Sequence, residues 1–421
     1  MKSLIARFPN SAFLDDAIMQ AGNTYLAQSK DDDAIEMFKT LFVKSPRSDQ
    51  IPEAYLKLGL IYFNRDSYDE SLNWYQRVLQ YYPGTPASNE AMLAIKEIYI
   101  AKGDPNGYIK YASKYPGSQV SASEQDSIIY LAAENQYFKG NMDKALDGFT
   151  QYLQQFPNGY FALQANFYKA ECLFTKQDFP NALKGYEYVV GQSQNRFSER
   201  ALARAANINY YDLKDYARSY ELYSKLQTVA TQDENKRECL IGLMRTSFFL
   251  KKYQECLDYI DKVAALPGLP QFYQAEMAYY KGMSLYNQKE YDKAVKELEF
   301  VVKNVNNEQA AESKYTMAKI YYLKGNKKQA EKEANEYLDK FPSYEYYLGK
   351  SFILLSDIYM DDNKTLQAKA TLQSLLDNYS KEAAVKAEAK QKLDVITQQE
   401  LDNSKLKLQD NGTQMQFEGG K

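Results

Sequence analysis

The sequence predicts an all-α solenoid of about ten helix hairpins, followed by one helix that caps the array. Two observations support this prediction: a unit of about 37 residues recurs along the chain, and apolar residues recur every three or four positions within it. Five units have a small residue, then an aliphatic one, and a large apolar residue four positions after the small one, and five others are weaker copies of this pattern. The small residues stand 36 to 38 positions apart: Ala34, Ser71, Gly107, Ala145, Ala182, Ser219, Cys256, Ala294, Ala330 and Ala368. A stacked array offers a long surface rather than one closed pocket, which favours a binding function.

Each unit contains two amphipathic helices joined by a short polar turn. In residues 276–302, Tyr279, Met283 and Tyr286 mark one helical face, and Val295 and Leu298 mark the next. This spacing has the period of helices, so we expect no strand. The turns are expected near 28–31, 64–67, 139–142, 176–179, 212–215, 250–253, 287–290, 324–327 and 361–364.

Small residues on both helices of a unit predict a close approach of their backbones. The pairs stand twelve positions apart: Gly22 with Ala34, Gly59 with Ser71, Ala133 with Ala145, Ala170 with Ala182 and Gly282 with Ala294. We therefore expect Ala145 and Ala182 to be buried against the first helix of their own unit. Ile95 and Met244 replace the small first-helix residue, so these two units depart from the pattern.

Proline ends many of the second helices, because it lacks the amide hydrogen and disfavours helix at the preceding residue. The endings are aromatic-proline pairs: Phe8-Pro9, Tyr82-Pro83, Tyr115-Pro116, Phe156-Pro157 and Phe341-Pro342. In the unit of Gly107 the proline, Pro116, follows the small residue by only nine positions, which predicts a shortened second helix.

The two ends of the chain differ from the repeats. Residues 1–380 are expected to form the array, with 381–405 as a capping helix that has a polar outer face. Residues 406–421 have little apolar surface to bury and are expected to be disordered. The chain opens inside a unit, so we expect it to be a fragment of a longer array.

The positions of Gly22, Tyr25, Ala34, Phe38 and Pro46 resemble those of the tetratricopeptide repeat, and the resemblance covers about residues 12–380. It implies a right-handed α-solenoid that binds a protein or peptide along its concave surface. The aromatic-proline endings also resemble repeats of bacterial cell-envelope proteins, such as outer-membrane assembly lipoproteins and Tol–Pal coordinating proteins. That resemblance implies a periplasmic or outer-membrane-associated protein, with the cytoplasm as the alternative.

Composition argues against several other functions. Histidine is absent and the three cysteines are far apart, so neither a catalytic histidine nor a metal site is expected. Nucleotide-binding and hydrolase motifs are missing, and we expect no enzyme activity and no cofactor. The net charge of −3 argues against nucleic-acid binding, and no apolar run is long enough for membrane insertion.

An aromatic stripe is the candidate binding site. One row lies eight residues before the small residues, and a second row lies seven residues earlier on the same helices. Their aromatic members are the candidate groove residues: Phe63, Tyr99, Tyr130, Tyr137, Phe167, Phe174, Tyr211, Phe248, Tyr279, Tyr286, Tyr315 and Tyr322. In tetratricopeptide proteins the first of these positions faces the concave groove. Rigid aromatic side chains of this kind suit an interface, although the same rings could simply pack neighbouring helices.

Two other functions are compatible with the sequence. The array could be a structural spacer that associates with copies of itself or belongs to a larger assembly. The aromatic stripe could also stack on sugars, which would make the chain a peptidoglycan or carbohydrate binder.

Overall fold

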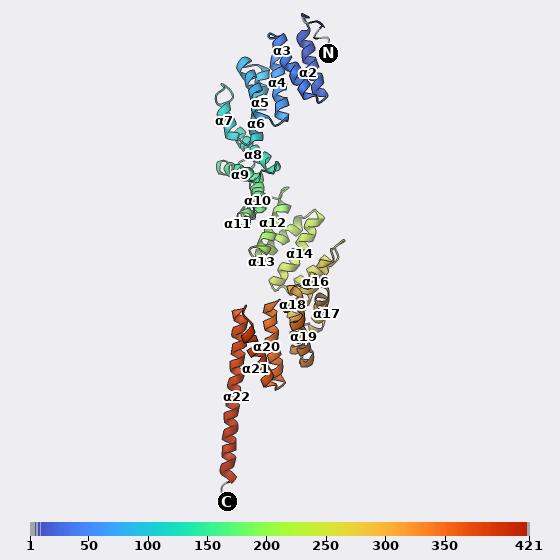
Figure 1. Ribbon diagram of the computed structural model, residues 1–421, viewed down its shortest axis with the longest axis vertical. Coiled ribbons are helices and arrows are strands. Elements are labelled where there is room, and N and C mark those ends of the chain that lie inside the picture. The colour runs from blue at the N-terminus through green and yellow to red at the C-terminus, as the bar shows by residue number, and fades with distance from the viewer. Residues whose placement is uncertain (1–4, 6, 9, 419–421) are drawn as a thin grey trace. The chain divides into compact units, whose positions relative to one another are not determined.

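The structure is a computed structural model that describes residues 5, 7, 8 and 10–418, without the side chains of 403–418. The chain forms two compact units, residues 1–205 and 206–421. Within the described residues all regular elements are helices, and none is a strand (Figure 1). The prediction of an all-α fold is therefore confirmed.

The first unit consists of five hairpins and the start of α12. Its helices are α2 (Leu14–Ala27), α3 (Asp31–Lys44), α4 (Ile51–Asn64), α5 (Tyr68–Tyr81), α6 (Pro86–Lys102), α7 (Pro105–Ala112), α8 (Ala122–Phe138), α9 (Met142–Gln155), α10 (Ala162–Thr175) and α11 (Phe179–Val190). Helix α12 (Ser198–Tyr211) contains the boundary between the units.

The second unit continues the same pattern to the end of the described chain. Its helices are α13 (Tyr216–Val229), α14 (Asp233–Phe249), α15 (Tyr253–Ala264), α16 (Phe272–Asn287), α17 (Tyr291–Asn304), α18 (Glu308–Leu323), α19 (Lys327–Lys340), α20 (Glu345–Asp361), α21 (Thr365–Asn378) and α22 (Ala383–Glu418). All nine predicted turns are confirmed, and α7 is the predicted short helix, with eight residues.

Each hairpin turn contains one residue in the left-handed backbone conformation. These residues are Ser29, Asp66, Gly103, Gly140, Gln177, Lys214, Lys251, Lys289, Gly325 and Asn363. The amide that follows donates back to the last turn of the first helix, as in the 2.9 Å bond from Lys252 N to the Ser247 carbonyl. This hydrogen bond satisfies a carbonyl that the helix end would leave unpaired. The turn therefore depends on backbone geometry, and only three of the ten residues are glycines.

Close packing within the hairpins follows the small residues. Ala145 and Ala182 are both fully buried, which confirms the prediction for them. A Cβ atom on Gly59 would lie 2.6 Å from the Tyr75 ring, so only glycine lets α4 approach that ring. In the α8–α9 and α10–α11 hairpins the first helix carries alanine instead, and the glycine is on the second helix. A Cβ atom on Gly185 would lie 2.8 Å from the Cβ of Ala170.

Within each unit the helices form two layers. The first helix of a hairpin contacts the first helix of the next: α4 contacts α6, α6 contacts α8, and α8 contacts α10. The second unit repeats this with α14, α16, α18 and α20. Large buried side chains of the second helices, such as Phe38, Phe149 and Tyr186, fill the space between the layers. This leaves the outer faces of the first helices available for a site.

Three of the aromatic-proline endings stop helices as expected, whereas α7 already ends at Ala112, three residues before Tyr115. Tyr82, Phe156 and Phe341 are the C-cap residues of α5, α9 and α19, and a proline follows each of them. Pro9, of the Phe8-Pro9 ending, lies outside the described residues.

Helix α22 covers the last hairpin. Val385, Ala389 and Ile396 are buried in a cluster with Leu372 and Leu375 of α21, as expected for a capping helix. The predicted disordered tail differs from the structure, in which α22 continues to Glu418. Lys, Leu and Gln are good helix formers, so this segment can extend the helix. Residues 419–421 lie outside the described residues.

Candidate functional site

The first predicted aromatic row closes the hairpin turns. Four of its rings contact the first residue of the following helix, five positions later in the chain. The ring centroids are 5.7 Å apart for Phe63 and Tyr68, 5.5 Å for Phe174 and Phe179, 6.0 Å for Phe248 and Tyr253, and 6.1 Å for Tyr286 and Tyr291. These rings are half-buried, so their edges remain accessible.

Three other members of this row have different partners. The Tyr99 ring contacts Tyr108 and Tyr111, and the Tyr137 ring lies 4.8 Å from that of Tyr168. The Tyr322 hydroxyl donates a 3.0 Å hydrogen bond to Asp361. Packing within or between hairpins therefore accounts for one side of each ring.

Most of the second predicted row belongs to the core. Tyr130, Phe167 and Tyr279 are 2%, 3% and 7% exposed, and Tyr315 is half-buried. These side chains come two helical turns before those of the first row, and they lie where neighbouring helices meet. Tyr130, for example, stacks on Phe161 with ring centroids 4.3 Å apart. A partner could not contact the three buried rings without a change in the fold, so they do not fit a docking ladder.

Tyr211 is the most exposed predicted site residue and belongs to a polar groove in the second unit. Arg245 donates a 2.6 Å hydrogen bond to the Tyr211 hydroxyl, and it pairs with both carboxylate oxygens of Glu276 at 2.5 and 2.8 Å. Burial lowers the pKa of Arg245, but the Glu276 carboxylate outweighs it and raises the pKa overall. The groove has a volume of about 320 Å³ and also includes Arg237, Glu238 and Tyr273. Glu276 therefore pairs with the central cation of this groove, Arg245.

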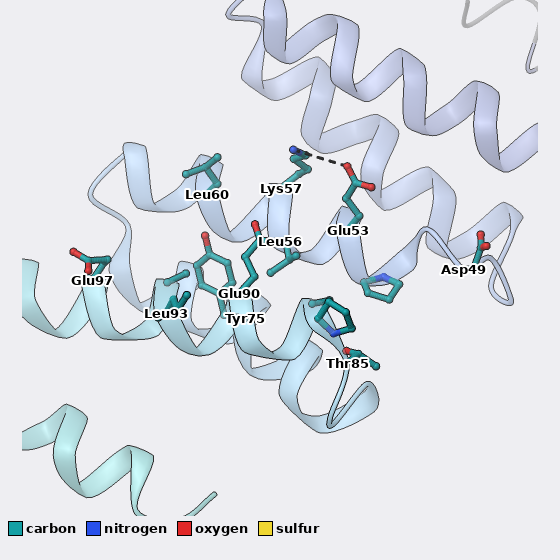
Figure 2. Close-up of a pocket in the computed structure, with 14 residues that line it drawn as sticks. Asp49, Glu53, Leu56, Lys57, Leu60, Tyr75, Thr85, Glu90, Leu93 and Glu97 are labelled. Carbon is teal, nitrogen blue, oxygen red and sulfur yellow. Dashed lines mark ion pairs between the residues drawn. The ribbon is translucent and has the colours of Figure 1, made fainter. Parts of the chain in front are cut away.

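A larger groove lies between α4 and α6 in the first unit, with a volume of about 660 Å³. Figure 2 shows its side chains, with those of α4 on one side and those of α6 on the other. Leu56 and Tyr75 are buried at its base, whereas Leu60 and Leu93 are 46% and 57% exposed. Two large apolar side chains therefore face solvent across one groove.

The rim of this groove is acidic. Asp49, Glu53, Glu90 and Glu97 line it, and Lys57 is the only basic lining residue. The Lys57 amine lies 3.9 Å from the Glu53 carboxylate, a loose pair between helix neighbours. Such exposed pairs contribute little to stability, so the rim keeps a negative charge that a partner could meet.

The pKa of the Tyr75 hydroxyl is raised at the base of this groove. Burial, and to a smaller extent the charge of Glu90, raises the pKa of Tyr75 to about 12. The phenol therefore stays neutral at physiological pH, and the base of the groove is uncharged.

The sequence did not predict this groove because its two exposed leucines, Leu60 and Leu93, lie outside the aromatic rows. Leu93 comes two positions before Ile95, so it points away from the packed face. An exposed leucine between two glutamates on a helix, as at Glu90, Leu93 and Glu97, was the available signal.

A third surface in the first unit covers aromatic rings with arginines. The guanidinium carbon of Arg204 lies 4.0 Å from the Phe174 ring centroid, and that of Arg200 lies 5.8 Å from the Phe167 ring centroid. A partner would meet these cations before it reached the rings. The predicted aromatic ladder is thus a cationic surface at this point.

The described residues hold no group of three or more metal-ligating side chains. Burial raises the pKa of the Cys172 thiol to about 12 and those of Cys239 and Cys256 to about 11. These thiols stay protonated and unreactive at neutral pH. Among the helices described, none is long and apolar enough to cross a membrane.

Family models of the tetratricopeptide repeat match residues 52–85, 130–197, 275–345 and 345–382. The chain contains tetratricopeptide repeats. Repeats of this family commonly mediate protein–protein interactions and peptide binding, and the family is generally non-enzymatic. No curated protein matches the chain in sequence.

Several solved tetratricopeptide-repeat structures are similar in fold. Yeast Tom70 has 13% identity and a TM-score of 0.36, and the match covers 92% of this chain and 96% of Tom70. The C-terminal part of a repeat-containing protein from Cytophaga hutchinsonii has 14% identity and a TM-score of 0.44, covering 62% and 98%. YrrB, described as a tetratricopeptide protein with an unusual peptide-binding site, has 17% identity and a TM-score of 0.37, covering 48% and 97%. At these identities the similarities do not identify a partner.

Proposed function

We propose that the chain is a non-enzymatic scaffold whose α4–α6 groove binds a peptide segment of a partner protein. The segment would carry apolar side chains flanked by Lys or Arg. The observation that carries this proposal is the pair of exposed leucines, Leu60 and Leu93, inside a groove with an acidic rim.

The leucines supply the apolar part of the contact. Each is about half exposed, so covering it with a partner side chain would contribute roughly 1 kcal/mol of hydrophobic free energy. Leu56 and Tyr75 are already packed at the base of the groove, so the partner side chain would contact a preformed surface. Contacts of this size favour a partner that uses several weak interactions together.

The rim supplies selectivity for charge. Four carboxylates and one ammonium group line the groove, so a basic segment is favoured over an acidic one. Charge complementarity of this kind acts mainly on the association rate and on the choice of partner. It should weaken as salt is added, because exposed charges are screened over about 10 Å at 0.1 M.

We also propose that half-buried rings of the first aromatic row make additional contacts with the partner. Phe63 is on α4, the helix that carries Leu60, and Tyr99 is on α6, the helix that carries Leu93. A partner that extends beyond the groove could contact the free edges of these rings.

Fluorescence anisotropy with a labelled peptide of alternating leucine and lysine tests the proposal. The double variant Leu60→Gln/Leu93→Gln should bind roughly tenfold more weakly, which corresponds to about 1.4 kcal/mol. Replacing Glu90 and Glu97 by Gln should weaken binding and reduce its dependence on salt. Leu366→Gln is the matched control, since Leu366 is 81% exposed on α21. Unchanged binding by the folded Leu60/Leu93 variant would refute the groove as the site.

We also propose that the scaffold works at a bacterial cell envelope, because its aromatic-proline endings resemble envelope repeats. Fractionation of the cells that produce the protein, with antibody detection, tests this location. Recovery in the cytoplasmic fraction alone would contradict it.

A further inference from the structure

The three arginines at and before the start of α12 form a surface of opposite character to the α4–α6 groove. Arg200 and Arg204 lie one turn apart on α12, and Arg196 precedes the helix. Each guanidinium carbon lies over an aromatic ring. The distances to the ring centroids are 4.6 Å for Arg196 over Phe197, 5.8 Å for Arg200 over Phe167 and 4.0 Å for Arg204 over Phe174.

One buried carboxylate, that of Glu171, contacts two of these arginines. Glu171 of α10 is 4% exposed and accepts a 2.6 Å hydrogen bond from the Tyr186 hydroxyl. It also pairs with Arg200, and its other oxygen lies 3.8 Å from Nε of Arg204. Burial leaves Glu171 unavailable to a partner, so its role is to hold the two arginines in place.

The carboxylates near these arginines already have partners. Glu171 alone pairs with both Arg200 and Arg204, and no described carboxylate lies within 4.0 Å of the Arg196 guanidinium. Glu134 contributes to the raised pKa of Tyr168, and it accepts a 2.6 Å hydrogen bond from the Tyr130 hydroxyl. Glu171 and Glu134 therefore already have protein partners, and Glu199 of α12 also has one.

The guanidinium edges remain accessible. The Arg200 and Arg204 side chains are 55% and 34% exposed, and Arg196 is exposed. Aromatic rings cover the flat faces of the guanidinium groups, which leaves their N–H edges for a ligand. A guanidinium edge of this kind pairs with a carboxylate through two parallel hydrogen bonds.

An apolar side chain borders the cations. Phe138, at the end of α8, is 69% exposed. Its ring centroid lies 5.8 Å from that of Tyr168, whose pKa responds to the charges of Arg196 and Arg200. Cations and an exposed ring therefore share one surface, formed by α8, α10 and α12.

We propose that this surface binds an acidic segment of a partner protein, through carboxylates on Arg196 and Arg200 and an apolar side chain on Phe138. It is a second binding surface, independent of the α4–α6 groove and selective for the opposite charge. Its occupant is a peptide with several Asp or Glu residues next to an aromatic or aliphatic one.

Binding of a labelled peptide of alternating glutamate and leucine to the full chain tests this inference. Arg196→Glu should weaken binding about tenfold and Arg196→Gln about threefold, because Arg196 is exposed and makes no ion pair that the fold needs. Arg77→Gln is the matched control: the Arg77 guanidinium carbon also lies over a ring, 4.4 Å from the Trp74 ring centroid, but on α5. Arg77→Gln should leave binding unchanged.

Several results would overturn the inference. They are failure of the acidic peptide to bind the parent, equal losses for Arg196→Glu and Arg77→Gln, or tighter binding of single-stranded RNA than of the acidic peptide. Failure of the α4–α6 groove would leave this inference standing, because that groove is tested with a basic peptide and with Leu60 and Leu93. Melting temperatures of the Arg196 variants should match that of the parent.

Discussion

Helices α4 and α6 form one surface region of the first unit, and α8, α10 and residues 198–205 of α12 form another. Both regions belong to the layer of first helices, yet their surfaces differ. Between α4 and α6, two leucines are exposed and the rim is acidic. At α10 and α12, the rings are covered by arginines, and a buried glutamate holds two of these arginines. One repeat pattern thus supports two surfaces of opposite charge.

The difference shows that the repeated positions and the functional positions are separate. The repeated small and aromatic residues pack the hairpins in both regions, and their burial is similar. The chemistry that a partner would meet comes from residues between them, such as Leu93 and Arg200. Four substitutions can test this division of roles.

The largest expected effect concerns a ring of the second aromatic row. Phe167→Ala should lower the free energy of unfolding by about 3–5 kcal/mol, because this ring is buried and stacks on Phe197 with centroids 4.5 Å apart. Leu93→Ala, on an exposed side chain, should change it by less than about 0.5 kcal/mol. Chemical denaturation followed by circular dichroism measures both. Similar losses would mean that Leu93 is also a packing residue.

A second substitution tests the register of the hairpins near the arginine surface. Ala182→Leu should cost about 1–3 kcal/mol or more, since Ala182 is fully buried between α10 and α11. Lys184→Leu, two positions later and exposed, is the control and should leave the melting temperature almost unchanged. Equal shifts for the two variants would contradict the packing described here.

A third test concerns the base of the acidic groove at high pH. The pKa of Tyr75 is raised to about 12 by burial, from an ordinary value of 10.0. Its contribution to stability is therefore complete below pH 10 and is lost as the pH rises from there towards 12. Between these values the parent should lose about 1–2 kcal/mol more than Tyr75→Phe, since each pKa unit corresponds to 1.36 kcal/mol. Urea unfolding at several pH values checks this, and parallel curves would show that the hydroxyl is solvated.

The smallest expected effect concerns the left-handed turn residues, which occur in the hairpins of both units. Lys251→Gly should stabilise the chain by up to about 1 kcal/mol, because glycine adopts a φ of 60° without a steric cost. Lys252→Gly, at the adjacent N-cap of α15 with φ −86°, should not stabilise. A thermal melt distinguishes the two variants.

Much of the fold could be predicted from the sequence, because its signals are local and repeated ten times. The turn positions and the burial of Ala145 and Ala182 follow from spacing alone. Which helix of a hairpin needs the glycine could not be predicted, because this depends on the ring or backbone that lies opposite on the other helix. Gly59 faces the Tyr75 ring, whereas Gly185 faces Ala170 and the Asn166 carbonyl.

The candidate site was less predictable for the same reason. Aromatic residues at a repeated helix position have the same pattern whether they face solvent or a neighbouring helix. Tyr279 and Tyr315 of the second row illustrate this, since one is buried and the other is half-buried. The position of Arg204 over the Phe174 ring depends on contacts between hairpins thirty residues apart, which one sequence does not reveal.

Photo-crosslinking of the basic leucine–lysine peptide, with the attachment sites mapped by mass spectrometry, tests the central claim most directly. The claim is that α4 and α6 form the surface that receives a basic, apolar segment. The account predicts attachment within residues 49–60 and 85–97, lost on competition with unlabelled peptide and in the Leu60→Gln/Leu93→Gln variant. Attachment mainly within residues 196–204, or at sites scattered along both units, would contradict it.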